Sequence, residues 1–124
     1  MPYDPHRTLD HVRGHVLTAG VSEDPPFIVR NGDEAIGPEA DVIRAFAASV
    51  GARVEWQWGS QERHLEALEK YHLDLVAGGL SPKTPWKTKV AVTRPFMHGH
   101  AIAVPPGENG FLLALERHLA SVER

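Results

Sequence analysis

Short apolar segments of strand length alternate with amphipathic segments of helical period, and this order restricts the fold of the 124-residue chain more than any other feature. Strands are expected at residues 15–21, 53–58, 73–77, 89–93 and 100–104, and helices at 38–50, at 61–70 and from about 109 onward. Strands that alternate with helices predict an α/β fold. We therefore expect a mostly parallel central sheet of about five strands with helices on both faces.

The clearest local signals are at the start of the helix expected at residues 38–50 and in the strand after it. Pro38 suits the first turn of a helix, and Glu39 and Asp41 favour its positive amino end. Trp56 and Trp58 are two residues apart on the strand that follows, so they share one face. For these tryptophans we favour core packing over recognition of a ligand.

Turn and cap residues predict where the smaller elements begin and end. Asn31-Gly32 is a typical hairpin turn between two short apolar segments. Thr8, Ser60 and Asn109 are each expected to cap the start of a helix. Residues 1–14 are expected to form a tether and a short helix, and residues 15–124 a single lobe.

Composition excludes several classes of protein. The net charge of -3, with no run of lysines or arginines, argues against nucleic acid as a partner. The absence of cysteine excludes disulfides, zinc–thiolate sites and thiol catalysis. No apolar run approaches the ~18 residues of a membrane span, and the amino end lacks the apolar core of an export signal. We expect either a cytoplasmic protein or an export segment that precedes this sequence.

The stretch "DLVAGGLSPKTPWKTKVAVTRPF" joins two of the expected strands through a loop that carries candidate binding residues. Gly78 and Gly79 follow the buried strand, and ligands of parallel sheets collect at the carboxyl ends of strands. Glycine lets a ligand approach the main chain, and the Ser81 hydroxyl both donates and accepts hydrogen bonds. Lys83 adds a point charge. Trp86 either packs over the loop or stacks on a ligand.

The sequence gives no pattern for catalysis, a cofactor or a metal. His98 and His100 are the minimal pair for a metal site if the strand starts early, but two ligands do not make a site. Asp24, Glu39 and Asp41 are carboxylates near loops, and we identify no histidine or serine partner that would turn them into acid–base or nucleophilic groups. We expect a protein that is not an enzyme and that has no cofactor.

Four stretches resemble, in order and spacing, the first lobe of the family 3 extracellular solute-binding proteins, which are type II periplasmic binding proteins. They are "GVSEDPPF", "GPEADVIRAFAASVGARVEW", "ALEKYHLDLVAGGLS" and "VAVTRPF", and they cover about residues 16–96. The resemblance implies binding of a small polar or amino-acid-like solute, with an ABC transporter permease as a partner. It also implies a periplasmic location, or an anchored one on the outer side of the inner membrane.

The resemblance implies functions for some residues and leaves one in question. Phe27 matches an aromatic position that covers the ligand, and Gly78, Gly79 and Ser81 match positions that bind a solute carboxylate. Aligned without gaps, the arginine that holds this carboxylate in the family falls on Trp86. An indole cannot supply the bidentate fork of a guanidinium, so carboxylate capture at this position is in question.

The second lobe of the family is missing from the sequence. Residues 97–100 stand where the family inserts that lobe, and the segment after them resembles its return into lobe one. A single lobe leaves the cleft face open, so we expect a possible homodimer in which Phe27, Trp86, Phe96 and Met97 meet a second copy. The alternative is a structural or regulatory interaction module that has lost solute binding.

Overall fold

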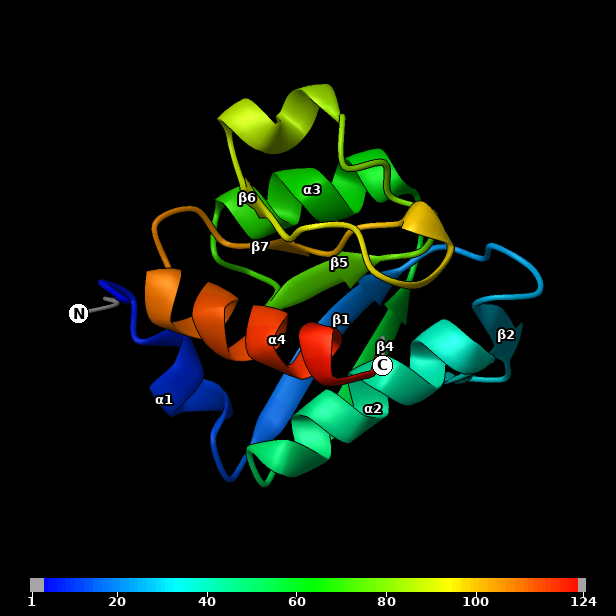
Figure 1. Cartoon of the computed structure of the whole chain (residues 1–124), viewed down its shortest axis with the longest axis horizontal. Coiled ribbons are helices and arrows are strands. Elements are labelled where there is room, and N and C mark those ends of the chain that lie inside the picture. Colours follow the sequence, from blue (N-terminus) through cyan, green and yellow to red (C-terminus); the bar gives the residue numbers. More distant parts are fainter. Residues whose placement is uncertain (1–3, 123–124) are drawn as a thin grey trace.

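A five-stranded sheet lies between two layers of helices in the computed structural model, which describes residues 4–122 (Figure 1). The strand order is β4-β1-β5-β7-β6, with β1 pairing in parallel to β4 and β5, and β7 antiparallel to β5 and β6. The bounds are β1 Val16–Val21, β4 Arg53–Trp58, β5 Leu75–Ala77, β6 Ala91–Val92 and β7 Ala103–Val104. The predicted fold class is confirmed.

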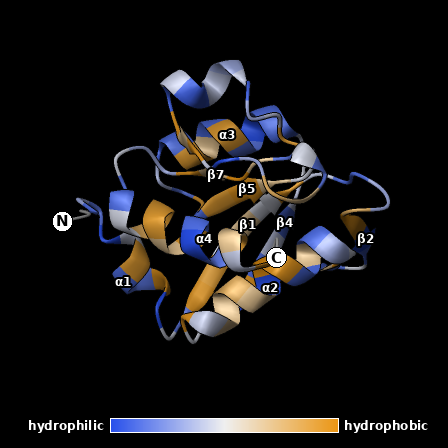
Figure 2. Cartoon of the chain, in the orientation of Figure 1, coloured by the Kyte–Doolittle hydropathy of each residue, from blue (hydrophilic) through white to orange (hydrophobic). Residues whose placement is uncertain are grey.

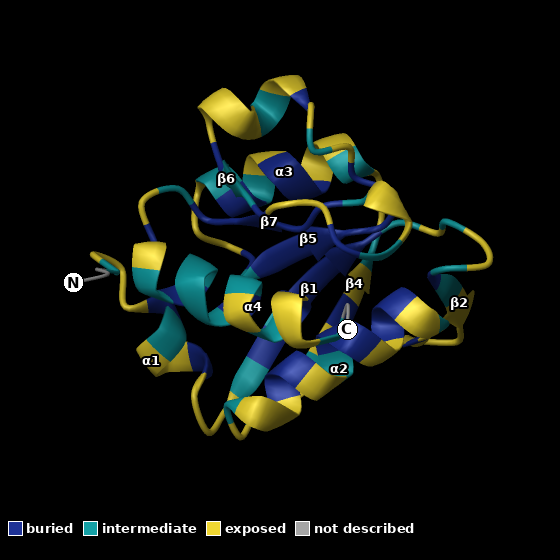
Figure 3. Ribbon diagram, viewed as in Figure 1, coloured by how far each residue is buried: buried dark blue, intermediate teal, exposed yellow. Residues whose placement is uncertain are grey.

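The helices cover both faces of the sheet, as predicted. One face carries α1 Thr8–Val12, α2 Pro38–Ser49 and α4 Asn109–Val122, and the other carries α3 Gln61–Glu69 (Figure 1). The sides of α2, α3 and α4 that face the sheet are apolar and buried, and their outer sides are polar and exposed (Figures 2 and 3).

Alternate residues of the central strands enter two separate hydrophobic clusters. Leu75 and Ala77 face the cluster under α2 and α4, whereas Val76 between them faces the cluster under α3. This follows from the two-residue period of a strand, and it requires apolar side chains on both faces. Trp56 is buried in the first cluster and Trp58 packs against it, so the prediction of core packing is confirmed.

The predicted cap at Ser60 and the predicted hairpin both form, and the turn of the hairpin is shifted by one residue. The hydroxyl of Ser60 accepts a hydrogen bond from the Arg63 N–H at 3.2 Å, which is the expected cap of α3. The expected hairpin forms from β2 Val29–Asn31 and β3 Glu34–Ile36. Its turn lies one residue later than predicted, because Asn31 is still paired with Glu34 and the turn is formed by residues 32–33.

The amino-terminal segment is fixed to the rest of the domain, where we expected a tether; residues 1–3 lie outside the described residues. The Asp4 carboxylate accepts from the Leu9 N–H in α1 and from the Phe111 N–H in α4. The buried Glu108 carboxylate accepts from the N–H groups of His6 and Thr8 and from the Thr8 hydroxyl. Two carboxylates therefore hold the starts of both helices together.

These contacts correct two predicted caps. Thr8 lies inside α1 after the capping position, which Arg7 holds without a side-chain hydrogen bond. Asn109 is likewise the first helical residue of α4, and the N–H of Phe111 in its first turn donates to Asp4, more than a hundred residues away. Sequence proximity suggested the wrong partners because the true acceptors are distant in the chain.

The two carboxyl-terminal strands are shorter than predicted. A one-turn 3-10 helix, Met97–Gly99, separates the two strands. On either side of it, the Thr93 N–H donates to the Ile102 carbonyl and the Phe96 N–H donates to the His100 carbonyl, each at 2.9 Å. His98 and His100 therefore lie in a turn, and β7 begins only at Ala103. Phe96 is buried in the core with 4% of its surface exposed, so it is not available to the dimer surface that we expected.

Candidate functional site

The candidate site is the edge of the sheet at which the three parallel strands end. Val21, Trp58 and Ala77 are the last residues of β1, β4 and β5, and the three arrowheads point to this edge (Figure 1). The loops that follow β1 and β5 meet here, and the turn at residues 97–100 contacts the first of them. In open parallel sheets this edge is where ligands bind.

Two glycines allow the loops after β1 and β5 to touch. Gly78 is buried with φ +113°, and a Cβ there would collide with the Ser22 carbonyl oxygen. Gly79 has φ +74° and is exposed, and a Cβ there would lie 3.1 Å from Asp24 Oδ2. Both residues are in a backbone region that favours glycine, so their first effect is to bring Asp24 close to the main chain after β5.

The other predicted residues of this loop form a separate group over α3. The Ser81 hydroxyl accepts from the Lys83 N–H at 3.1 Å, and both residues are exposed. Trp86 lies in the 3-10 helix Pro85–Thr88 and is half-buried against the hydrophobic cluster under α3. The Lys89 ammonium nitrogen is 5.3 Å from the centre of the Trp86 ring. These contacts are those of a side chain that packs over its own loop.

Phe27 lies in the other group, beside the turn at residues 97–100. Its ring is 3.9 Å from that of His98 and 5.5 Å from that of His100, measured between centroids. The loop that carries it is closed by hydrogen bonds between Asp24 and Ile28 in both directions, at 2.8 and 3.1 Å. The loop therefore presents Phe27 from a defined backbone.

Sequence reasoning missed the cluster of charged groups beside Phe27. Glu39 Oε2 is 2.7 Å from His100 Nδ1, and Asp24 Oδ2 is 3.6 Å from the same nitrogen. The expectation that Glu39 and Asp24 have no histidine partner is therefore wrong. The partner is 61 residues from Glu39 and enters by a turn, so no spacing in the sequence indicated it.

Glu39 and one oxygen of Asp24 are shielded from water, although about a third of the Asp24 side chain as a whole is exposed. Only 1% of the Glu39 side chain is exposed, and burial raises the pKa of Glu39, an effect that the hydrogen bond to His100 opposes. Asp24 Oδ2 is buried and has no hydrogen-bond partner among the described residues. A carboxylate oxygen in this state favours a nearby donor or positive charge, because it has lost water without a full replacement.

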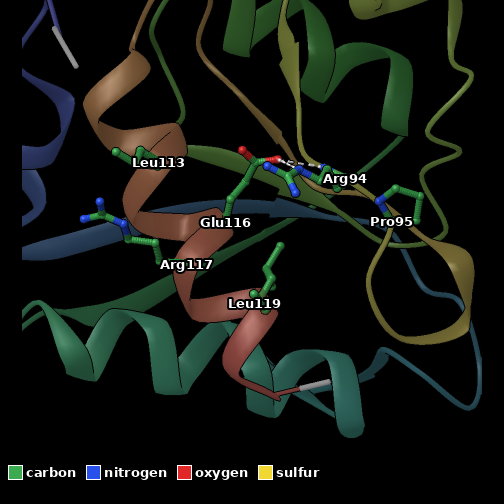
Figure 4. Close-up of a pocket in the computed structure, with 7 residues that line it drawn as sticks. Arg94, Pro95, Leu113, Glu116, Arg117 and Leu119 are labelled. Carbon is green, nitrogen blue, oxygen red and sulfur yellow. Dashed lines mark hydrogen bonds and ion pairs between the residues drawn. The ribbon is translucent and has the colours of Figure 1, made fainter. Parts of the chain in front are cut away.

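A shallow cavity of about 260 Å³ lies elsewhere, between α4 and residues 94–95 (Figure 4). The Glu116 carboxylate accepts from the Arg94 N–H at 3.0 Å at its rim, and Leu113 and Leu119 line it. None of the predicted binding residues lines this cavity. It supplies apolar surface and an exposed ion pair, which do not define a polar solute site.

Within residues 4–122, no three His, Asp or Glu side chains are placed to hold a metal ion together. None of the helices in this part of the chain is long and apolar enough to cross a membrane.

Comparison with known structures places the fold. A point mutant of the arginine-bound domain 1 of TmArgBP is 22% identical, with a TM-score of 0.78 over 92% of this chain and 97% of that chain. The truncated arginine-bound protein from T. maritima is 23% identical, with a TM-score of 0.62 over 71% of this chain and 43% of that one. An ancestral cationic amino acid solute-binding protein is 29% identical, with a TM-score of 0.64 over 73% and 41%.

The shares of each chain that align show which part of a solute-binding protein this chain resembles. It spans nearly all of the single domain but only about two fifths of the longer binding proteins. No curated protein matches the sequence significantly. The family model of the bacterial extracellular solute-binding proteins, family 3, matches residues 17–118, which is most of the chain. The chain therefore belongs to the family 3 bacterial extracellular solute-binding proteins.

Proposed function

We propose that the chain is a noncatalytic binding lobe for a small amino-acid-like solute that carries a positive charge. The observation that carries the proposal is a pair of carboxylates beside Phe27 at the carboxyl edge of the sheet, the buried Glu39 and Asp24, whose Oδ2 is buried without a hydrogen-bond partner among the described residues. A cationic group satisfies such carboxylates, and an aromatic face adds apolar and cation–π contact.

The relatives support a cationic solute. Domain 1 of TmArgBP and the protein from T. maritima are described as arginine-bound, and the ancestral protein is described as binding cationic amino acids. The exposed Gly79 and Ser81 remain candidates for the polar end of the solute. Gly78 is buried and is proposed to act only by shaping the loop. Lys83 and Trp86 are proposed to border the site from the loop over α3.

We propose that the solute reaches an ABC transporter permease and that the lobe works in the periplasm or on the outer face of the inner membrane. Residues 15–124 form a single lobe in this proposal, with the turn at 97–100 in place of a second lobe. One lobe covers a solute on one side only, so binding is expected to be weak in comparison with a closed two-lobed clamp.

Titration calorimetry with L-arginine, L-lysine, L-glutamine and L-glutamate tests the proposal. We expect heat of binding from the two cationic amino acids, and a loss of about tenfold in affinity in Asp24→Asn, because a charged hydrogen bond is lost. Asp41→Asn is the matched control, since Asp41 is exposed on α2 and pairs with Arg44 on the same helix.

Two results would contradict the proposal in different ways. Equal affinity for L-glutamate and L-arginine would remove the cationic selectivity. No binding of any amino acid, together with a stable dimer that Trp86→Ala dissociates, would identify the chain as an interaction module that has lost solute binding.

A further inference from the structure

The chain places one of its own turns on the proposed solute site. We call residues 97–100 the cap turn. It connects Phe96 to Ala101, and backbone hydrogen bonds form at both of these flanking residues. The Phe96 N–H donates to the His100 carbonyl, and the Ala101 N–H donates to the Leu80 carbonyl, each at 2.9 Å. The first bond closes the cap turn on itself, and the second attaches its carboxyl-terminal end to the segment that follows β5.

One side chain of the cap turn occupies the acidic end of the site. His100 Nδ1 lies 2.7 Å from Glu39 Oε2 and 3.6 Å from Asp24 Oδ2. An imidazole nitrogen with one hydrogen can donate to only one of these oxygens, which agrees with the unpaired state of Asp24 Oδ2. His100 thus stands where the ammonium or guanidinium of a solute would stand.

A second side chain covers the aromatic surface of the site. The His98 ring lies 3.9 Å from the ring of Phe27, with an interplanar angle of 31°. His98 itself is exposed and has φ +62°, a left-handed conformation that histidine adopts more often than most residues other than glycine. The imidazole of His98 thus covers the Phe27 ring from an exposed position in the turn.

We propose that the cap turn is an intramolecular competitor of the solute, and that a solute binds only when His98 and His100 leave Phe27, Glu39 and Asp24. This inference rests on the proposed function, because it concerns the same site. The solute and the cap turn would use the same carboxylates and the same aromatic face, so they cannot occupy the site together. A competitor within the chain lowers the apparent affinity by the fraction of molecules in which the site is open.

The test compares the affinity of L-arginine for the wild-type chain and for variants with a weakened cap turn. His98→Asn removes the imidazole and keeps a residue that tolerates the left-handed backbone. His100→Ala removes the partner of Glu39, and the double variant removes both contacts. His72→Ala is the control, since His72 is exposed and precedes β5, at the opposite edge of the sheet.

We expect the double variant to bind L-arginine at least about tenfold more tightly than the wild type, with His98→Asn in between and His72→Ala unchanged. Unchanged or weaker binding in His98→Asn, in His100→Ala and in the double variant would overturn the competitor and leave the proposed function intact. Absence of L-arginine binding in the wild type and in all variants would overturn the proposed function, and the competitor with it. His98→Asn leaves the His100–Glu39 contact in place, so it also decides the question if His100→Ala does not fold.

Hydrogen exchange gives a second readout on the wild-type chain. The Phe96 amide is bonded to the His100 carbonyl, which closes the cap turn. Saturation with L-arginine should speed exchange of this amide if the cap turn is displaced. Slower exchange would show that the solute tightens the turn, which would make the turn a wall of the site and overturn the competitor.

Discussion

Gly78 shows how a single residue without a side chain determines the shape of the site. Its φ of +113° is rare for other residues, and its Cα lies against the main chain of Ser22. Any Cβ at this position has to push the loop after β1 away from the loop after β5. The approach of Asp24 to Gly79 depends on that contact between the loops.

We expect Gly78→Ala to lower the free energy of unfolding by about 2–4 kcal/mol, from backbone strain together with a collision in a packed region. Gly107→Ala is the control. Gly107 also has positive φ, at +78°, but its Cβ would meet nothing within 4 Å, so only the strain of about 1 kcal/mol applies. Urea unfolding of both variants measures the difference, and equal losses would show that the collision is relieved without cost.

The site lacks the arginine that the family resemblance leads us to expect. Trp86 stands in the loop where the resemblance expects an arginine, and its half-buried ring packs over α3. The side chain beside the acidic pair is instead the imidazole of His100 in the cap turn. The chemistry of this edge is therefore acidic and aromatic, in contrast to a site built around a guanidinium.

At the scale of elements, the carboxylates of Asp4 and Glu108 join the amino-terminal segment to the start of α4. Asp4 satisfies backbone N–H groups at the starts of α1 and α4, and Glu108 satisfies those of His6 and Thr8. The first four N–H groups of a helix have no partner within the helix, so a buried helix start needs such acceptors. The short α1 is held to α4 by these bonds and by packing.

We expect Asp4→Ala to lower the free energy of unfolding by about 1–2 kcal/mol, because it removes the acceptor at two helix starts. Asp10→Ala is the control, since the Asp10 carboxylate forms an exposed pair with Arg7, the residue before α1. Such surface pairs contribute little. Thermal unfolding followed by circular dichroism measures both. A loss no larger in Asp4→Ala than in Asp10→Ala would contradict the capping function.

For the whole molecule, buried ionisable groups make the free energy of unfolding depend on pH. Burial lowers the pKa of His64, which lies on the buried side of α3 beside Gly20 and has no partner for Nδ1 among the described residues. The folded state therefore binds fewer protons than the unfolded state. The contribution of His64 is complete above its ordinary pKa of 6.5 and is lost as the pH falls through its lowered value.

Two carboxyl groups act in the opposite direction. Burial raises the pKa of Glu39 and of Asp74, so each favours the folded state at low pH and loses this contribution as the pH rises through its raised value. Because these effects overlap, a comparison of variants is needed to separate the contribution of His64 to the free energy of unfolding. We expect His64→Leu to show a weaker fall in the free energy of unfolding below about pH 6.5 than the wild type does.

Urea unfolding between about pH 5 and pH 8 measures this dependence, with the exposed His72→Leu as the control. The same slope in His64→Leu and in the wild type would show that His64 is not the group that titrates on unfolding.

The sequence by itself determined the architecture. Alternating periods of two and of three to four residues predicted the strands β1, β4 and β5 and the helices α2 and α3 within one or two residues. These signals are local, because a strand or helix that buries one face needs apolar residues at fixed spacing. Gly78 and Gly79 were predicted at the carboxyl edge for the same reason, since the edge follows from strand direction.

Only the tertiary structure decided which side chains meet. The contacts of Glu39 with His100, of Phe27 with His98 and of Asp4 with Phe111 join residues that are 61 or more positions apart. No period or cap rule links such residues, because their distance depends on how the loops and the amino-terminal segment fold over the finished sheet. The cap turn was visible in the sequence as a short connection, and its position on the proposed solute site became visible only in the folded chain.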